Sequence, residues 1–271
     1  MATVLLLRHG RTTANADGSL AGRTAVSLDE TGEAQARAAA ERLAGVPLAA
    51  VVSSPLHRCL RTLEIVLPGV SPAIDTRLTE CGYGDWEGQS LKKLARDPLW
   101  KVIQNHPSAV TFPGPDGESM AAMSARAVAA IRSWDDRVSR EHGADALWLA
   151  CTHGDVIKAI VADALGLHLD LFQRIAVDPG SITVIRYTPA RPFVLRLNET
   201  AAQLSTLVPR KRRRRRRPRL ADSDAPVGGG AGAGTDGVPA GGRGDGAEGG
   251  TGDPLSRTGS ARLAGGDTVL P

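Results

Sequence analysis

Three short apolar runs, each of which ends at polar residues, are the feature that most restricts how this chain can fold. They cover residues 4–7, 48–53 and 146–150. Runs of this length and apolarity are typical of strands buried on both faces of a sheet. Stretches with apolar residues at helical spacing separate them, and this alternation favours parallel strands. We therefore expect an α/β fold, a three-layer sandwich with a mostly parallel central sheet flanked by helices.

The rest of the pattern adds helices and two further strands. Apolar periodicity and helix-start residues predict helices at residues 29–43, 55–67, 90–96, 117–142 and 155–165. Asp29 or Thr31 is the expected cap of the first helix, and Pro55 suits the first turn of the second. Residues 181–187 and 193–198 are expected as strands near a sheet edge. The segment before the helix at 117–142 is expected to consist mostly of loops.

Composition changes abruptly near residue 209. From there to residue 271 large apolar side chains nearly vanish, and Gly, Asp, Arg, Ala and Pro dominate. Such a segment buries too little apolar surface to offset about 1–2 kcal/mol of backbone entropy per residue. We predict one globular domain at residues 1–208 and a disordered tail, arginine-rich and then glycine-rich, at residues 209–271.

The basic charge of the chain belongs to this predicted tail. Of the 33 Lys and Arg residues, 12 lie beyond residue 208, together with 7 of the 29 Asp and Glu residues. Residues 210–219 are almost continuously basic, but no aromatic side chains for base stacking are interleaved with them. We expect at most weak, salt-sensitive and non-specific binding of polyanions. A passive, solvated tail is the alternative.

Cysteine usage and the start of the chain bear on the compartment. Cys59, Cys81 and Cys151 are odd in number and widely spaced, which favours buried, reduced thiols over disulfides or a zinc site. The apolar run near residue 4 is too short for a signal peptide or a membrane span. We therefore expect a cytoplasmic protein that is not inserted in a membrane.

Each of the three main predicted strands leads into polar residues with a common chemistry. Arg8 and His9 follow the first, Ser54 and then Arg58 follow the second, and His153 follows the third. In an open α/β sheet, ligands bind beyond the carboxyl ends of parallel strands, so these side chains should converge. Arginine matches phosphate oxygens with a fork of donors, and a neutral imidazole can attack phosphorus. The set therefore indicates phosphoryl transfer through a phosphohistidine.

Four motifs follow one another along the chain: Arg8-His9-Gly10 with Thr12 and Asn15; Ser53-Ser54-Pro55-Leu56-His57-Arg58; Leu78-Thr79-Glu80 with Gly84-Asp85-Trp86-Glu87-Gly88; and Thr152-His153-Gly154. In type and order these motifs resemble those of the histidine phosphatase superfamily, in its phosphoglycerate-mutase-like branch. The likeness spans residues 3–200 and implies a phosphoglycerate-mutase-like fold. With its arginine-rich extension, the chain is similar in particular to actinobacterial proteins described as phosphomutases or phosphatases.

The resemblance implies a role for each matching residue in the phosphate pocket. His9 would accept the phosphoryl group. Arg8 and Arg58 would clamp its oxygens, His153 would complete the cationic pocket, and Asn15 would add a side-chain contact. The alternative for His9 is a structural role, which is usual for a single histidine at the end of a strand. The presence of Arg8, Arg58 and His153 favours the catalytic role.

A carboxyl group is also implied. Glu80 would donate a proton to the leaving alcohol and then take one from the attacking water, although Asp85 and Glu87 stand close by. Arg23 could contact substrate or lie on the surface. Three lysines could recognise a second acidic group of the substrate, but solvated helix faces are the expected positions of all three: Lys92, Lys93 and Lys158.

No metal and no organic cofactor are expected. The histidines lack the short spacings of metal ligands, and neighbouring arginines would repel a cation. The expected ligand is a small phosphorylated metabolite, and a mutase would also need a bisphosphate primer. The sequence gives no oligomeric state and does not choose among phosphosugars, phosphoglycerate derivatives, nucleotide-loop precursors and phosphoproteins.

Hydrolysis of a phosphate monoester is the predicted reaction. The resemblance implies that mutases carry a longer insertion between the acid and the second histidine, whereas the stretch from Glu80 to His153 is short here. Water should therefore reach the phosphoenzyme. A phosphomutase of the phosphoglycerate mutase type is the first alternative. A non-catalytic phosphoryl-binding protein is the second, and the presence of all the catalytic residue types speaks against it.

Overall fold

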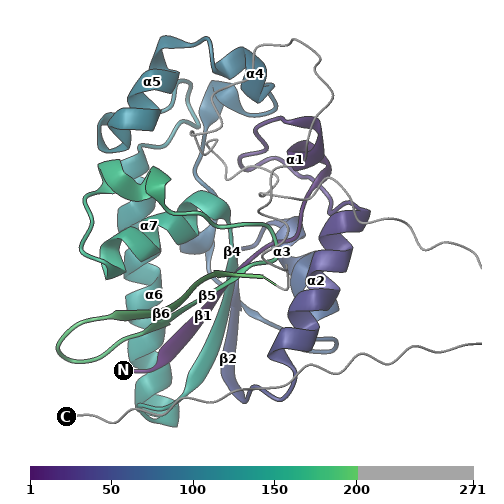
Figure 1. Ribbon diagram of the computed structural model, residues 1–271, viewed down its shortest axis with the longest axis vertical. Coiled ribbons are helices and arrows are strands. Elements are labelled where there is room, and N and C mark those ends of the chain that lie inside the picture. The colour runs from purple at the N-terminus through teal and green to yellow at the C-terminus, as the bar shows by residue number, and fades with distance from the viewer. Residues whose placement is uncertain (201–271) are drawn as a thin grey trace, which may run out of the picture. The chain divides into compact units, whose positions relative to one another are not determined.

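The computed structural model describes residues 1–200, and within them a six-stranded sheet lies between two layers of helices (Figure 1). The strands follow the spatial order β3 (Ala73–Ile74), β2 (Leu48–Ser53), β4 (Leu147–Thr152), β1 (Thr3–Arg8), β5 (Ile182–Arg186) and β6 (Phe193–Glu199). The first four are parallel, and the last two run antiparallel to their neighbours. The expected α/β sandwich with a mostly parallel sheet is confirmed.

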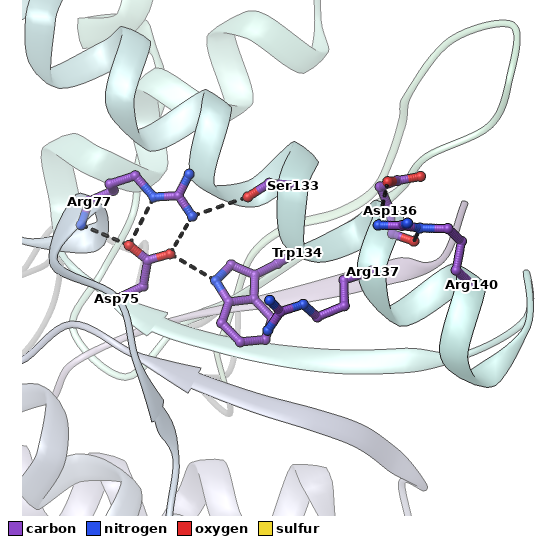
Figure 2. A pocket seen from close by; sticks show the side chains of 7 residues that line it. All are labelled: Asp75, Arg77, Ser133, Trp134, Asp136, Arg137 and Arg140. Atoms are coloured by element: carbon purple, nitrogen blue, oxygen red, sulfur yellow. Dashed lines mark hydrogen bonds and ion pairs between the residues drawn. The ribbon is translucent and has the colours of Figure 1, made fainter.

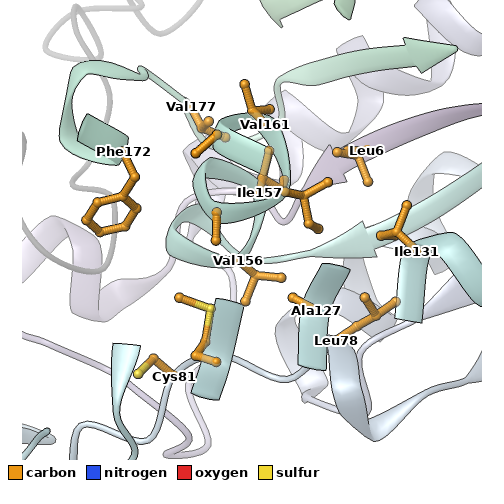
Figure 3. Packing of buried hydrophobic residues seen from close by; sticks show 14 of the residues in the cluster. Leu6, Leu78, Cys81, Ala127, Ile131, Val156, Ile157, Val161, Phe172 and Val177 are labelled. Atoms are coloured by element: carbon orange, nitrogen blue, oxygen red, sulfur yellow. The ribbon is translucent and has the colours of Figure 1, made fainter. Parts of the chain in front are cut away.

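Two pairs of long helices cover the sheet. Helices α2 (Glu30–Leu43) and α3 (His57–Val66) pack on one face, against alternate β1 residues such as Leu5 and Leu7. Helices α6 (Met120–His142) and α7 (Gly154–Ala164) pack on the other face, where Leu6 points (Figure 3). Because successive residues of a strand point to opposite faces, the unbroken apolar run in β1 serves both layers.

Helix α7 lies within the core rather than on its surface. Ten of its eleven residues are buried, and Val156, Ile157 and Val161 pack among side chains from α6 and the sheet (Figure 3). A helix with apolar side chains on all of its faces is buried by its neighbours on all sides. Two polar residues of α7, Asp155 and Lys158, are therefore inside the protein, whereas Asp163 is partly exposed.

Short elements connect these layers near the carboxyl end of the sheet. They are α1 (Thr13–Asp17), the 3-10 helices η1 (Thr76–Leu78), η2 (Gly84–Trp86), η3 (Pro107–Ala109) and η4 (Leu169–Arg174), α4 (Leu91–Leu94) and α5 (Pro98–Asn105). The two-residue strand β3 and the helix α5 are not among the sequence-based predictions. The sequence does mark α5, since Asp97 caps it, Pro98 opens it, and the buried Trp100 and Ile103 recur at helical spacing.

The predictions at the ends of the other helices differ from the structure by a few residues. Asp29 is the cap of α2, and its side chain accepts from the backbone N–H of Gly32. Helix α3 begins at His57, two residues after Pro55. The predicted boundary at residue 208 and the predicted tail at residues 209–271 lie outside the described residues and stay predictions. Within residues 1–200 no helix combines the length and the apolarity needed to cross a bilayer.

The loop that follows β1 docks on the start of α2 through two glycines. A Cβ on Gly10 would lie 2.4 Å from the Gly32 carbonyl oxygen, and one on Gly32 would lie 2.0 Å from the Arg11 carbonyl oxygen. Both distances are far shorter than atoms can approach. The Arg11 side chain fixes the same contact through an ion pair of 2.7 Å with Asp29. These glycines therefore allow the backbone of residues 9–11 to lie against the helix.

Alanine at Gly32 is expected to destabilise the protein, although alanine is the better helix former. The added methyl group has no space, and such overpacking costs about 1–3 kcal/mol. The free energy of unfolding in urea measures the effect. The reverse exchange, Ala34→Gly at an exposed site on the same helix, reports helix propensity alone, about 1 kcal/mol. A Gly32→Ala protein as stable as the parent would contradict the backbone contact.

Candidate active site

The ends of β1 and β4 and the first turn of α3 bring the predicted phosphate-binding residues together. Arg8 ends β1 and His9 follows it, Arg58 lies at the second position of α3, and His153 directly follows β4. All four side chains are buried. The backbone N–H of His9 donates to the Thr152 carbonyl at 3.1 Å, which fixes the two strand ends beside each other.

Hydrogen bonds define which nitrogen of His9 is available for chemistry. Nδ1 lies 2.8 Å from the carbonyl oxygen of Gly10, which can only accept, so Nδ1 carries the proton. Nε2 then has a lone pair. Burial, followed by the charges of Arg58 and Arg8, holds the pKa of His9 well below its ordinary value. The imidazole is therefore neutral and presents a nucleophilic nitrogen at physiological pH.

Arg58 lies between the two histidines. Its Nε donates to Nε2 of His9 at 3.3 Å and to Nδ1 of His153 at 3.2 Å. Its terminal nitrogens donate to the carbonyl oxygens of Gly22, at 2.6 Å, and Thr24, at 3.3 Å. These contacts hold the guanidinium plane next to the attacking nitrogen.

His153 is oriented from both sides of its ring. Because Nδ1 accepts from Arg58, Nε2 carries the proton and donates to Oγ of Ser54 at 2.8 Å. The rings of His9 and His153 meet edge to face, with centroids 5.2 Å apart. Burial and the charge of Arg58 lower the pKa of His153 as well. Ser54, at the end of β2, is thus part of the site through His153.

Arg8 brings a second buried cation to the site. Its Nη1 donates to the Val177 carbonyl at 2.6 Å. Burial lowers the pKa of Arg8 to about 10, and the neighbouring carboxyl groups, Glu80 first, act in the opposite direction. The guanidinium is therefore charged at neutral pH.

Glu80 is the acid of this region. Its side chain is buried, and Oε1 accepts from the backbone N–H of Cys81 at 3.0 Å. Burial, and next the negative charge of Asp155, raises the pKa of Glu80 to about 7, against the opposing effect of Arg58. A carboxyl with this pKa can both donate and accept a proton near neutral pH. Asp85, one alternative acid, is exposed, and Glu87 accepts from two backbone N–H groups.

A pair of arginines holds the backbone at Glu80. Nη2 of Arg126, on α6, and Nε of Arg23 both donate to the Glu80 carbonyl oxygen at 3.1 Å. Glu118 forms ion pairs with both of them, at 2.7 Å with Arg126 and 2.9 Å with Arg23. Arg23 thus contacts the segment of the acid as well as facing solvent. Arg126 and Glu118 were not predicted from the sequence, because Arg126 is one of several polar residues on a helix and Glu118 only precedes its cap, Ser119.

Asn15 lies in the loop after the nucleophile but has a structural role as well. Its Oδ1 accepts from the backbone N–H and the hydroxyl of Thr12, which caps helix α1. A contact between Asn15 and a phosphate would therefore use its amide N–H groups.

The expectation for Lys158 is wrong. Lys92 and Lys93 are exposed as expected, but Lys158 is only 1 % exposed and forms an ion pair of 3.4 Å with Asp155. The reason is that Lys158 lies in a part of α7 where every neighbouring residue of the helix is buried.

A hollow of about 280 Å³ lies beside α6, away from these residues, and the two aspartates that line it already have partners (Figure 2). Asp75 accepts from Arg77 and from the Trp134 indole, while Asp136 pairs with Arg140. No histidine lines it. Within the described residues no group of three His, Cys, Asp or Glu side chains is arranged to hold a metal ion.

The comparison with family models agrees with this geometry. A model of the histidine phosphatase superfamily (branch 1) matches residues 4–200. The chain belongs to this superfamily. It is therefore a phosphoryl-transfer enzyme, and the resemblance found in the four sequence motifs is confirmed.

Known members of the superfamily similar to this enzyme include both mutases and phosphatases. The 2,3-bisphosphoglycerate-dependent phosphoglycerate mutase 2 of Gloeobacter violaceus is 27% identical over 183 residues, which are 66% of this chain and 82% of the mutase. YhfR of Bacillus stearothermophilus is 30% identical with a TM-score of 0.66, covering 74% of this chain and 98% of YhfR. A mycobacterial glucosyl-3-phosphoglycerate phosphatase is 27% identical with a TM-score of 0.64, covering 73% and 99% of the two chains.

Proposed function

We propose that the enzyme hydrolyses a phosphate monoester of a small metabolite through a phosphohistidine on His9. The observation that carries this proposal is the neutral His9 ring, whose Nδ1–H is bound to the Gly10 carbonyl and whose Nε2 faces the Arg58 guanidinium. A nucleophilic lone pair thus lies beside a donor that matches phosphate oxygens.

In the first step, Nε2 of His9 forms a bond to phosphorus as the ester oxygen–phosphorus bond breaks. Arg58 and Arg8 stabilise the charge on the transferring phosphoryl oxygens. The dianion also favours protonation of His153, which would add a third donor. Asn15 completes the proposed pocket through its amide. Glu80 gives its proton to the leaving alkoxide, so the product leaves as a neutral alcohol.

In the second step, water attacks the phosphohistidine. The Glu80 carboxylate takes a proton from the water, the phosphorus–nitrogen bond breaks, and its electron pair returns to Nε2 of His9. Glu80 ends protonated, ready for the next ester. The same carboxyl thus serves as acid and then as base, which a pKa of about 7 permits in both directions.

Hydrolysis is proposed over mutase activity because little chain is available to close the site. Between Glu80 and α6, residues 81–119 form only the four-residue α4, the eight-residue α5 and two single-turn 3-10 helices. Small elements of this kind leave water a path to the phosphoenzyme. Three buried, free cysteines are consistent with a reducing compartment, and we infer that the enzyme works in the cytoplasm.

A panel of phosphate monoesters tests the function. The full chain is expected to release inorganic phosphate from alkyl monoesters and from 4-nitrophenyl phosphate. The control reaction uses 3-phosphoglycerate with its bisphosphate primer. Mutase flux well above phosphate release would refute the proposal in favour of the mutase alternative, and absence of any turnover would favour a phosphoryl-binding protein.

The pH dependence of kcat/KM should follow the protonation of Glu80. Only its protonated form can donate to the leaving alkoxide, so kcat/KM for an alkyl phosphate is expected to fall about tenfold per pH unit above about pH 7. No limb from His9 is expected near pH 6.5, because its pKa is lowered. Measuring kcat/KM from pH 5 to 9 checks this.

The matched control is Glu80→Gln. It should lower alkyl ester hydrolysis by about 10²-fold or more and abolish the alkaline limb. In kcat/KM, which reports the first step, it should affect 4-nitrophenyl phosphate much less, since that leaving group needs little protonation. An unchanged limb in Glu80→Gln would show that another group supplies the proton.

A further inference from the structure

A buried ion pair next to the site has no part in the steps above. Nζ of Lys158 lies 3.4 Å from Oδ1 of Asp155, and the two side chains are 1 % and 0 % exposed. The ammonium also donates to Oε1 of Gln173 at 3.0 Å and lies 5.4 Å from the ring centroid of Phe172. Removing two charges from water is costly, and such a pair is often no more stable than apolar residues of the same volume. Stability alone therefore does not account for this buried ion pair.

The pair is tied to the catalytic acid through a tyrosine. The hydroxyl of Tyr83 donates to Oδ2 of Asp155 at 2.8 Å. Tyr83 is fully buried and lies three residues after Glu80, while Asp155 lies in the first turn of α7, two residues after His153. This hydrogen bond therefore links the segment of the acid to the helix that begins at the second histidine.

The buried charges favour a neutral Glu80 in the substrate complex. Arg8, Arg58 and Lys158 are buried cations, and Asp155 is a buried anion beside them. Together they leave an excess of two positive charges, which one phosphate dianion balances when Glu80 is protonated. An ionised Glu80 would add an unbalanced negative charge in a region of low dielectric, where that is expensive.

We propose that Asp155 is a positioning residue that keeps the Glu80 carboxyl protonated for the first step, with Lys158 and Tyr83 holding the Asp155 carboxylate in place. The inference rests on the proposed role of Glu80. It explains why an anion lies in a pocket built for an anionic substrate, where it would otherwise weaken phosphate binding.

The groups that act on Glu80 from each neighbouring element support this assignment. Asp155, on α7, raises the Glu80 pKa second only to burial, while Arg58 and Arg8 lower it. Arg126 and Arg23 contact its backbone carbonyl, and both are paired with Glu118. Asp155 thus counteracts the lowering of the Glu80 pKa by Arg58 and Arg8. Lys158 holds Asp155 through the ion pair, and its own charge acts on Glu80 in the direction opposite to that of Asp155.

The test compares the pH profile of alkyl phosphate hydrolysis in three variants. Asp155→Asn is expected to shift the alkaline limb of kcat/KM downward by about 1 pH unit. The double variant Asp155→Asn/Lys158→Met also loses the opposing cation, so its limb is expected to shift downward by less. The double variant removes both charges and leaves no unpaired buried ammonium, so it guards against misfolding of the single variant. Glu80→Gln should show no limb at all.

A second readout does not require turnover. The ¹³C carboxyl resonance of Glu80, assigned by its loss in Glu80→Gln, should titrate about 1 pH unit lower in Asp155→Asn than in the parent, and lower by a smaller amount in the double variant. A merely structural role would reduce activity or stability without moving this midpoint.

The outcomes separate the two proposals. Folded single and double variants whose limbs and Glu80 resonances titrate as in the parent would overturn the role of Asp155 while leaving that of Glu80 intact. A parent enzyme whose alkyl ester hydrolysis is insensitive to Glu80→Gln would instead overturn the proposed function of the acid.

Discussion

Replacing His9 with asparagine is expected to lower kcat for phosphate release by about 10⁴-fold or more, because removing a covalent nucleophile leaves only the binding groups. Asparagine is a close match for the ring in one respect. Its amide can still donate to the Gly10 carbonyl, as Nδ1 does at 2.8 Å. It has no nitrogen lone pair that can attack phosphorus. The loss should therefore reflect chemistry rather than a disturbed loop, and steady-state phosphate release measures it.

The control for His9 is another histidine of the same region. His57 opens helix α3, next to Arg58, but its side chain is exposed. His57→Asn should keep activity within a few-fold of the parent. Residual activity of His9→Asn close to that of the parent would mean that the phosphoryl acceptor is a different residue.

Replacing Arg58 with lysine is expected to lower kcat/KM by about 10²–10⁴-fold, although the charge is kept. The guanidinium donates from Nε to the two histidines and from its terminal nitrogens to the carbonyl oxygens of Gly22 and Thr24. An ammonium cannot reproduce this planar set. Loss of two charge-assisted hydrogen bonds at about 1.5–3 kcal/mol each gives a reduction of this size.

Initial rates with 4-nitrophenyl phosphate measure the effect, and inhibition by inorganic phosphate shows whether ground-state binding falls as well. The matched control is Arg61→Lys, one turn further along α3, where the partners are Glu33 and Glu64 at the surface. That exchange should change kcat/KM by less than about threefold, as surface ion pairs contribute little. Equal effects of the two exchanges would show that Arg58 has no special place in the site.

The arrangement of the fold could be predicted because its central strands, β1 and β4, are buried on both faces. The unbroken apolar run in β1 and the runs in β2 and β4 are legible in the sequence, and parallel strands have only one edge at which their carboxyl ends meet. The convergence of His9, Arg58 and His153 follows from that rule. The two-residue β3 is too short to carry a periodic signal, whereas α5 was missed although Asp97, Pro98 and the spacing of Trp100 and Ile103 mark it.

Contacts between polar residues that lie far apart in the sequence could not be predicted. Nothing in the local pattern indicates that Arg126 reaches the Glu80 carbonyl or that Tyr83 donates to Asp155. Lys158 is different, since a signal was present. Val156, Ile157, Ala159 and Ile160 surround it on every side of the helix, and a helix without a polar face buries its lysine with the rest.

The central claim concerns a bond between phosphorus and Nε2 of His9, and trapping that bond tests it most directly. The enzyme is mixed with a ³²P-labelled monoester, quenched within milliseconds and digested. We predict label on the peptide that contains His9, stable in alkali and released by acid, and absent from His9→Asn. Full turnover without such an adduct, or with the label on another residue, would contradict the account.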